Sequence, residues 1–180
     1  SSGPAPPAKT LVLDNGAYTI KAGFAGPDIK VKSEDCHVIP NCMARDRNRK
    51  IYIGSELSEC KDFGEIQFRR PVEKGYTVNW EAEKEIWEHE FFDKKAALFC
   101  DPEETGLILT EAPNALPVLQ SHCDQVVFEE FGFARYYRAI GMRFQIPGIR
   151  DSFLTLTVPD TRSYIECIQR CPSYFQGSTA

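Results

Sequence analysis

The chain has 180 residues, which is enough for one ordinary domain with a single hydrophobic core. Its 42% apolar and 26% charged residues exclude an intrinsically disordered protein, and its formal net charge of −5 argues against a surface dedicated to nucleic acid. No apolar stretch approaches the roughly 20 residues that span a bilayer, so the composition is typical of a globular protein.

The seven cysteines are widely spaced, odd in number and without a Cys-x-x-Cys pair. This pattern excludes a regular disulfide framework and favours a reducing compartment. Cys167 and Cys171 could share one face of a helix, but two thiols without further ligands make a poor zinc site. We therefore predict ordinary buried or surface cysteines and no metal centre.

Residues 1–9 lack the charged start and apolar centre of a signal peptide and are predicted to form a flexible tail. The next segment is predicted to be a β-hairpin, because an apolar run over residues 10–14 enters Asn15-Gly16 and an alternating run over residues 17–25 leaves it. Asn-Gly in this position favours a type I′ turn, which needs positive φ at both central residues. The alternation predicts that four side chains share one face of the second strand: Tyr18, Ile20, Ala22 and Phe24.

Two further short strands are predicted over residues 35–41 and 49–57, on either side of the basic run "RDRNRK" at residues 45–50. We interpret the basic run as a solvated loop tip, with a DNA contact as the alternative. The clearest helix is "NWEAEKEIWEHEFF" at residues 79–92, where Asn79 is the predicted N-cap and Glu81 and Glu83 favour the positive helix start. Its predicted apolar stripe is Trp80, Trp87 and Phe91, and His89 is predicted to be exposed.

Residues 105–113, "TGLILTEAP", are predicted to form a buried strand that ends at a proline, and residues 118–131 a second helix. The apolar stripe of that helix is predicted to be Leu119, Cys123, Val126, Val127 and Phe131. His122 beside Cys123 suggests a catalytic pair, but adjacent helical residues point in different directions, so we favour a core cysteine and a surface histidine. The order of strands, helix, strand and helix predicts an α/β layer with a mixed sheet.

Three blocks of this chain resemble the actin family: "LVLDNGAYTIKAGFAG" (residues 11–26), "RRPVEKGYTVNWEAEKEIWEHEFF" (69–92), and "LILTEAP" (107–113) followed by "VVFEEFGFARYYR" (126–138). They occur in the order and spacing of that family over residues 10–138. The resemblance implies the N-terminal domain of an actin-like ATPase (ribonuclease H-like), a mixed β-sheet flanked by helices. Residues 37–70 correspond to a small subdomain-like insertion. Residues 139–180, with one strand-like run at 152–158 and one weak helix, do not match, so the predicted fold is incomplete.

The resemblance implies that the hairpin faces the phosphates of ATP bound with magnesium. A tight turn exposes consecutive backbone N–H groups that bind anions. By the same resemblance, Asp14 orients water around Mg²⁺ and Lys21 returns as a point charge to the β- and γ-phosphates. The implied cofactor-binding residues are Asp14, Asn15, Gly16, Ala17, Tyr18 and Lys21.

The chain departs from conventional actin in ways that predict a non-catalytic protein. Ala17 replaces a serine hydroxyl, and Tyr18 places a ring where glycine lets phosphates approach. The stretch between "IPNC" and "YIGSEL" is short, so no filament is expected. No second Asp-x-Gly hairpin is found, and Gln145, a candidate to position the attacking water, has surroundings that do not align. We expect residues 139–180 to come from alternative splicing or an imperfect gene model.

Three segments are similar to one nuclear branch of the actin family: residues 11–18, residues 38–42, and "FEEF" followed by "YYR". This resemblance implies a subunit of a nuclear chromatin-remodelling complex that exchanges a histone variant into nucleosomes. The implied partners are a remodelling ATPase and other subunits, with the nucleosome contacted indirectly, in the nucleus and secondarily the cytoplasm. The alternatives are an actin-like ATP-binding protein with weak ATPase activity and a truncated product without independent function.

Overall fold

The computed structural model describes residues 9–26, 29, 35–61, 63–111 and 115–140. Their main feature is a five-stranded sheet in the order β10-β9-β1-β2-β3. Strand β1 pairs in parallel with β9, which pairs in parallel with β10, whereas β1-β2-β3 is antiparallel. This arrangement confirms the predicted mixed sheet. The bounds are β1 (Lys9–Asn15), β2 (Thr19–Ala25), β3 (His37–Pro40), β9 (Thr105–Glu111) and β10 (Arg135–Ile140).

The first hairpin is confirmed, but its predicted turn type is wrong. Neither Asn15 nor Gly16 is among the described residues with positive φ, so the turn is not type I′. Three residues, 16–18, connect β1 to β2, and a Cβ on Gly16 would lie 2.6 Å from the Thr19 carbonyl oxygen. We call residues 16–18 the phosphate turn, after the role that the resemblance to actin-like ATPases predicts for them. Tyr18 belongs to this turn and is 73% exposed, so it does not share the buried face of Ile20 and the other strand residues.

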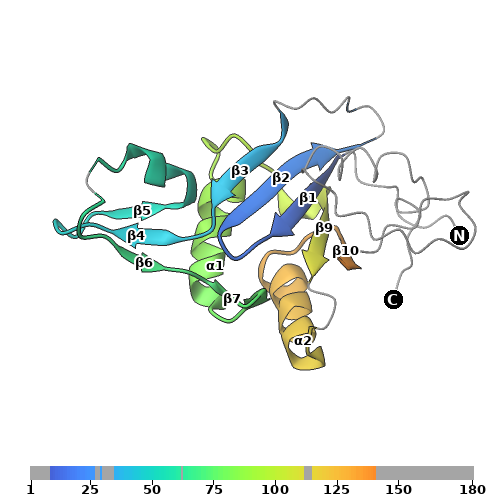
Figure 1. Cartoon of the computed structure of the whole chain (residues 1–180). Coiled ribbons are helices and arrows are strands. Elements are labelled where there is room, and N and C mark those ends of the chain that lie inside the picture. The colour runs from blue at the N-terminus through green and yellow to red at the C-terminus, as the bar shows by residue number, and fades with distance from the viewer. Residues whose placement is uncertain (1–8, 27–28, 30–34, 62, 112–114, 141–180) are drawn as a thin grey trace, which may run out of the picture.

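A second, three-stranded sheet projects from the main sheet (Figure 1). It comprises β4 (Met43–Arg45), β5 (Ile51–Ile53) and β6 (Gln67–Arg69), and a 3-10 helix follows at η2 (Gly54–Glu59). These strands lie within the predicted insertion at 37–70, whereas β3 at its start pairs with the main sheet. The sequence pattern did not predict β4, because only Met43 and Ala44 are buried in this short strand.

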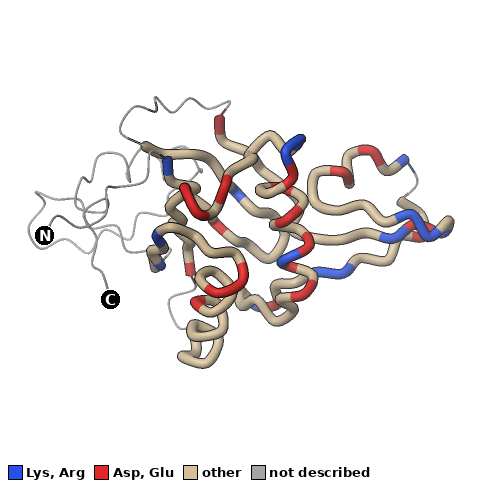
Figure 2. The backbone as a smooth tube through the Cα atoms, turned by 180° about the vertical axis from the view of Figure 1, so that it is seen from behind, with Lys and Arg blue, Asp and Glu red and all other residues tan. Residues whose placement is uncertain are grey.

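The basic run forms the connection from β4 to β5, which confirms a solvated loop tip. Asp46 shapes the loop, because its Oδ1 accepts hydrogen bonds from the amides of Asn48 and Lys50 at 2.8 and 2.9 Å. Arg49 adopts φ 65° there. Figure 2 shows that Lys and Arg residues gather at this far end of the small sheet.

Helix α1 (Trp80–Trp87) continues into a π-helical turn, η3 (Glu88–Phe92). As predicted, Asn79 caps it: the Asn79 side chain accepts the Ala82 amide at 3.1 Å. The predicted stripe of Trp80, Trp87 and Phe91 is buried in the main core. His89 is not exposed as predicted, because it lies half-buried between Glu56 and Glu90, at 3.3 and 3.2 Å.

Helix α2 (Pro117–Gln125) continues into η5 (Val126–Glu130), and Pro117 occupies its first turn. Cys123, Val126 and Val127 are buried as predicted, and both helices contribute to one core with the sheet. His122 is exposed, and burial raises the pKa of the Cys123 thiol to about 11, which agrees with a core cysteine. The remaining described elements are β7 (Val72–Glu73), β8 (Tyr76–Thr77) and η4 (Pro102–Glu104).

Strand β10 was not predicted, and it extends two residues past the expected boundary at Arg138. Its register runs from Arg135 opposite Gly106 to Ile140 opposite Glu111. Mixed aromatic and basic residues give it no clear period, so its strand conformation depends on pairing with β9. The predictions for residues 1–8 and 141–180, including Gln145, lie outside the described residues. Among those described, no helix is long and apolar enough to cross a membrane, and no group of acidic, His and Cys side chains suits a metal ion.

Candidate functional site

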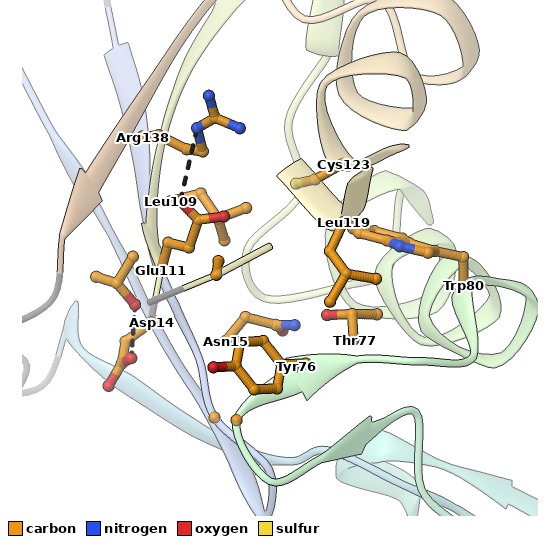
Figure 3. A pocket seen from close by; sticks show the side chains of 14 residues that line it. Asp14, Asn15, Tyr76, Thr77, Trp80, Leu109, Glu111, Leu119, Cys123 and Arg138 are labelled. Atoms are coloured by element: carbon orange, nitrogen blue, oxygen red, sulfur yellow. Dashed lines mark hydrogen bonds and ion pairs between the residues drawn. The ribbon is translucent and has the colours of Figure 1, made fainter. Parts of the chain in front are cut away.

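A cavity of about 290 Å³ lies at the carboxyl ends of β1, β9 and β10. Open α/β sheets bind ligands at this edge. In Figure 3 its polar side carries Asp14, Glu111 and Arg138, which face an apolar wall of Trp80 and Leu119 from the two helices. The cavity is therefore polar where the strands end and apolar where the helices pack.

Asp14 is fixed at the end of β1 by two contacts. Its Oδ1 accepts a hydrogen bond from Thr110 Oγ1 at 2.7 Å, and its Oδ2 lies 3.1 Å from Lys21 Nζ. The Asp14 and Lys21 side chains are 41% and 40% exposed. A carboxylate held in this way, with solvent beside it, suits the outer hydration shell of a magnesium ion.

The phosphate turn is held from beneath by Asn41, the residue that follows β3. The Asn41 amide donates to the Tyr18 carbonyl at 2.9 Å, and its Nδ2 donates to the Gly16 carbonyl at 3.0 Å. The Gly16 amide donates to the Asp14 carbonyl at 3.1 Å. The Ala17 and Tyr18 amides donate to no acceptor among the described residues. Two backbone N–H groups at the tip of the turn thus remain for an anion.

The structure brings only part of the predicted set to the cavity. Asp14, Asn15 and Gly16 line it, whereas Ala17, Tyr18 and Lys21 do not. The Arg70 guanidinium carbon lies 4.6 Å from the centre of the Tyr18 ring, outside the cavity. Tyr18 is thus not among the residues that line the cavity, and the expectation that its ring takes the space of a phosphate stays a prediction.

Sequence reasoning missed the polar residues that β9, β10 and α2 bring together. Glu111 Oε2 accepts a hydrogen bond from Gln120 Nε2 at 2.9 Å and lies 3.7 Å from Arg138 Nε. Arg138 Nη1 also lies 3.1 Å from Asp124 Oδ1. Glu111 lies in the predicted strand "LILTEAP" but was not predicted as a site residue, and its pairing with Arg138 required the unpredicted strand β10.

Glu83 was assigned to the helix start, yet its side chain is fully buried beneath the phosphate turn. Trp87 Nε1 donates to Glu83 Oε1 at 2.8 Å, Asn41 Nδ2 lies 3.4 Å from the same oxygen, and Asn15 supplies a third hydrogen bond. Burial raises the pKa of Glu83 to about 7, and these hydrogen bonds only partly oppose that rise. In the sequence, the only indication that Glu83 is buried was Trp87, which lies one turn further along α1.

The sheet order, the hairpin facing a cavity and the two packed helices are features of an actin-like fold. The actin family model matches residues 5–144, and the chain belongs to the actin family.

Among its relatives, actin-related protein 6 of Neurospora crassa is 68% identical over 145 residues, which cover 80% of this chain and 32% of that protein. Actin-like protein arp6 of Aspergillus fumigatus is 51% identical over 146 residues, with 75% and 31% covered. Actin-related protein 6 of Dictyostelium discoideum is 35% identical over 147 residues, with 81% and 29% covered. The chain thus spans about a third of the length of these curated relatives.

Proposed function

We propose that this chain acts as part of a non-catalytic actin-fold subunit of a nuclear chromatin-remodelling complex that exchanges a histone variant into nucleosomes. The observation that carries the proposal is the 68% identity to actin-related protein 6 of Neurospora crassa over 145 residues. The proposed partners are a remodelling ATPase and other subunits of the complex. The nucleosome is an indirect partner, and the nucleus is the main location, with the cytoplasm second.

Two features of the described residues support a scaffold rather than an ATPase or a filament subunit. The phosphate turn carries Ala17, which has no hydroxyl to contact a terminal phosphate. The link between β4 and β5 is only the short loop at residues 46–50, in the region that actin subunits use to grip one another. These two features favour a protein that uses the actin fold to bind partner subunits.

The proposal is tested by capture of the tagged 180-residue chain from a nuclear extract of its source, followed by mass spectrometry. We expect the remodelling ATPase and its histone-exchange subunits to be recovered. The matched control is Leu109→Asp, which places a charge in the buried strand β9 and should unfold the domain. Equal recovery with this variant, or no remodeller subunits with the unchanged chain, would contradict the scaffold role.

We propose that binding of ATP with magnesium is a second function of this chain, and the backbone N–H groups at the tip of the turn support this proposal. Gly16 lines the cavity and cannot carry a side chain without meeting the Thr19 carbonyl, and the Ala17 and Tyr18 amides donate to no acceptor among the described residues. Asp14 would hold waters of the magnesium ion, and Lys21 would face the phosphate chain. Bound magnesium would neutralise phosphate charge.

Calorimetry with Mg-ATP tests this second function. We expect binding heat with the unchanged chain and its loss in Lys21→Ala, because the cation beside the turn is removed. Lys50→Ala is the matched control, since Lys50 lies in the loop between β4 and β5 of the small sheet. If the unchanged chain gives no heat at millimolar nucleotide, this second function is wrong and the scaffold role is untouched.

A further inference from the structure

The conformation of the phosphate turn depends on one side chain outside it. Asn41 makes two of the contacts that hold the turn, through its own amide to the Tyr18 carbonyl and through Nδ2 to the Gly16 carbonyl. Asn41 is fully buried, so its side chain cannot exchange these contacts for water. Whatever orients the Asn41 amide group therefore also orients the turn.

Glu83 is the group that orients it. Its fully buried side chain accepts from Trp87 Nε1 at 2.8 Å and lies within 3.5 Å of Asn41 Nδ2 through both oxygens. Asn15, the residue before the turn, also hydrogen-bonds to this carboxylate. Because an ionised carboxylate only accepts hydrogen bonds, it draws the NH₂ ends of both asparagines toward itself.

In that arrangement the side-chain oxygens of the two asparagines are left without hydrogen bonds from the described residues. Asn15 Oδ1 and Asn41 Oδ1 are both buried and have no hydrogen-bond partner among the described residues. Buried amide oxygens without partners are uncommon in native proteins and need a physical reason. The reason here is that both amide groups turn their NH₂ ends to the Glu83 carboxylate, which leaves their oxygens on the far side, where no described residue donates to them.

We propose that Glu83 is a positioning residue whose protonation state sets the conformation of the phosphate turn. In the carboxylate form it keeps Asn41 Nδ2 directed at both Glu83 and the Gly16 carbonyl. A protonated Glu83 has one O–H donor, and Asn41 Oδ1 is an unused acceptor for it. Rotation of the amide to accept that proton moves Nδ2 away from the Gly16 carbonyl, so the turn loses one of its two ties to Asn41.

The side chains that hydrogen-bond to Glu83 carry no charge, and His122, which packs on Trp80, makes no contact with the carboxylate in the described residues. The pKa of about 7 places the transition near neutral pH, and all three donors to the carboxylate are neutral. Cys42 follows Asn41, and burial raises the pKa of its thiol, so it stays neutral. Several charged side chains of β1, β2 and α1 pair with groups other than Glu83: Asp14 with Lys21, Glu81 with Arg69, and Lys84 with Glu130. Lys9 of β1 donates to the Phe99 carbonyl. In η3, Glu90 pairs with His89, which also faces Glu56.

Nuclear magnetic resonance of the ¹⁵N-labelled 180-residue chain between pH 5.5 and 8.5 tests the proposal. We expect the Trp87 indole N–H and the Gly16 amide to titrate with one shared midpoint, at about pH 7. Glu83→Gln should abolish both titrations, because the side chain can no longer ionise. Asn41→Ala should preserve the Trp87 titration and remove that of Gly16.

The matched control is Glu81→Gln, which removes an exposed carboxylate two residues away on the same helix and should leave both titrations unchanged. Amide signals of β1 and β9 in each variant report whether the sheet is folded. The proposal is overturned if Gly16 does not titrate with Trp87 in the unchanged chain, or if Glu83→Gln keeps the Gly16 titration. A purely structural Glu83 would give neither the shared midpoint nor the separation by Asn41→Ala.

Discussion

Replacement of Glu83 by glutamine should make the domain more stable at alkaline pH and leave its stability at acid pH nearly unchanged. The ordinary pKa of the carboxyl group is 4.5, and burial raises that of folded Glu83 to about 7. Between these values the folded state binds more protons than the unfolded state, so the free energy of unfolding falls as the pH rises. Below 4.5 both states are protonated, and above about 7 both are ionised.

The size of the effect comes from the same two values. The difference between 4.5 and about 7, at about 1.36 kcal/mol for each pKa unit, gives about 3 kcal/mol by which a buried charge lowers stability above neutral pH. Glutamine keeps an oxygen that accepts from Trp87 Nε1 and adds an NH₂ group that can donate to Asn41 Oδ1. We therefore expect up to about 3 kcal/mol of added stability at pH 8.5 and little change at pH 5.

Urea denaturation followed by tryptophan fluorescence at pH 5, 7 and 8.5 measures this difference, provided the slope against urea is the same in both proteins. Glu81→Gln serves as the control, since the exposed Glu81–Arg69 pair should give a small change that is the same at each pH. A Glu83→Gln variant that is destabilised equally at pH 5 and pH 8.5 would refute the assignment of a buried, titrating carboxylate.

Three further predictions concern a glycine, a helix cap and a buried cysteine. Gly54→Ala should lower stability by about 1–3 kcal/mol in thermal unfolding, because Gly54 has φ 51° and an added Cβ would lie 2.4 Å from Glu90 Oε1. Asn79→Ala should cost about 1 kcal/mol in urea denaturation, because it removes the cap on the Ala82 amide. Cys123 should resist iodoacetamide at pH 8 in the native protein and react after denaturation, as mass spectrometry of its peptide would show, because burial raises its thiol pKa to about 11.

The sequence predicted those elements whose signal lies within a few residues. Asn79 before an amphipathic run marked the start of α1, and "TGLILTE" marked β9 by its apolar length and the proline beyond it. Strand β10 escaped prediction because its residues become a strand only through parallel pairing with β9, about 30 residues earlier in the chain. The turn type was wrong for a related reason: Asn41, a tertiary partner, ties the Gly16 and Tyr18 carbonyls to β3 and overrides the local Asn-Gly preference.

The residues of the candidate site also fall into those predicted from a local motif and those that only the packed structure shows. Asp14, Asn15 and Gly16 were found because one contiguous motif carries them, and they do line the cavity. Glu83 was not found, since helix periodicity and charge at a helix start both place a glutamate in solvent. Only the packed structure shows that its carboxylate lies under the turn with Trp87 and Asn41 as donors.

The phosphate turn is therefore not a self-sufficient motif in this chain. Its two carbonyl ties come from Asn41, and the orientation of Asn41 comes from a buried glutamate that lowers stability whenever it is ionised. Leucine or methionine at position 83 would remove that cost and would also remove the acceptor that holds both asparagine amides. We infer that Glu83 is buried here because of the conformation that it enforces. In this chain that conformation is the phosphate turn beside the cavity, the part of the actin fold where ligand phosphates are expected.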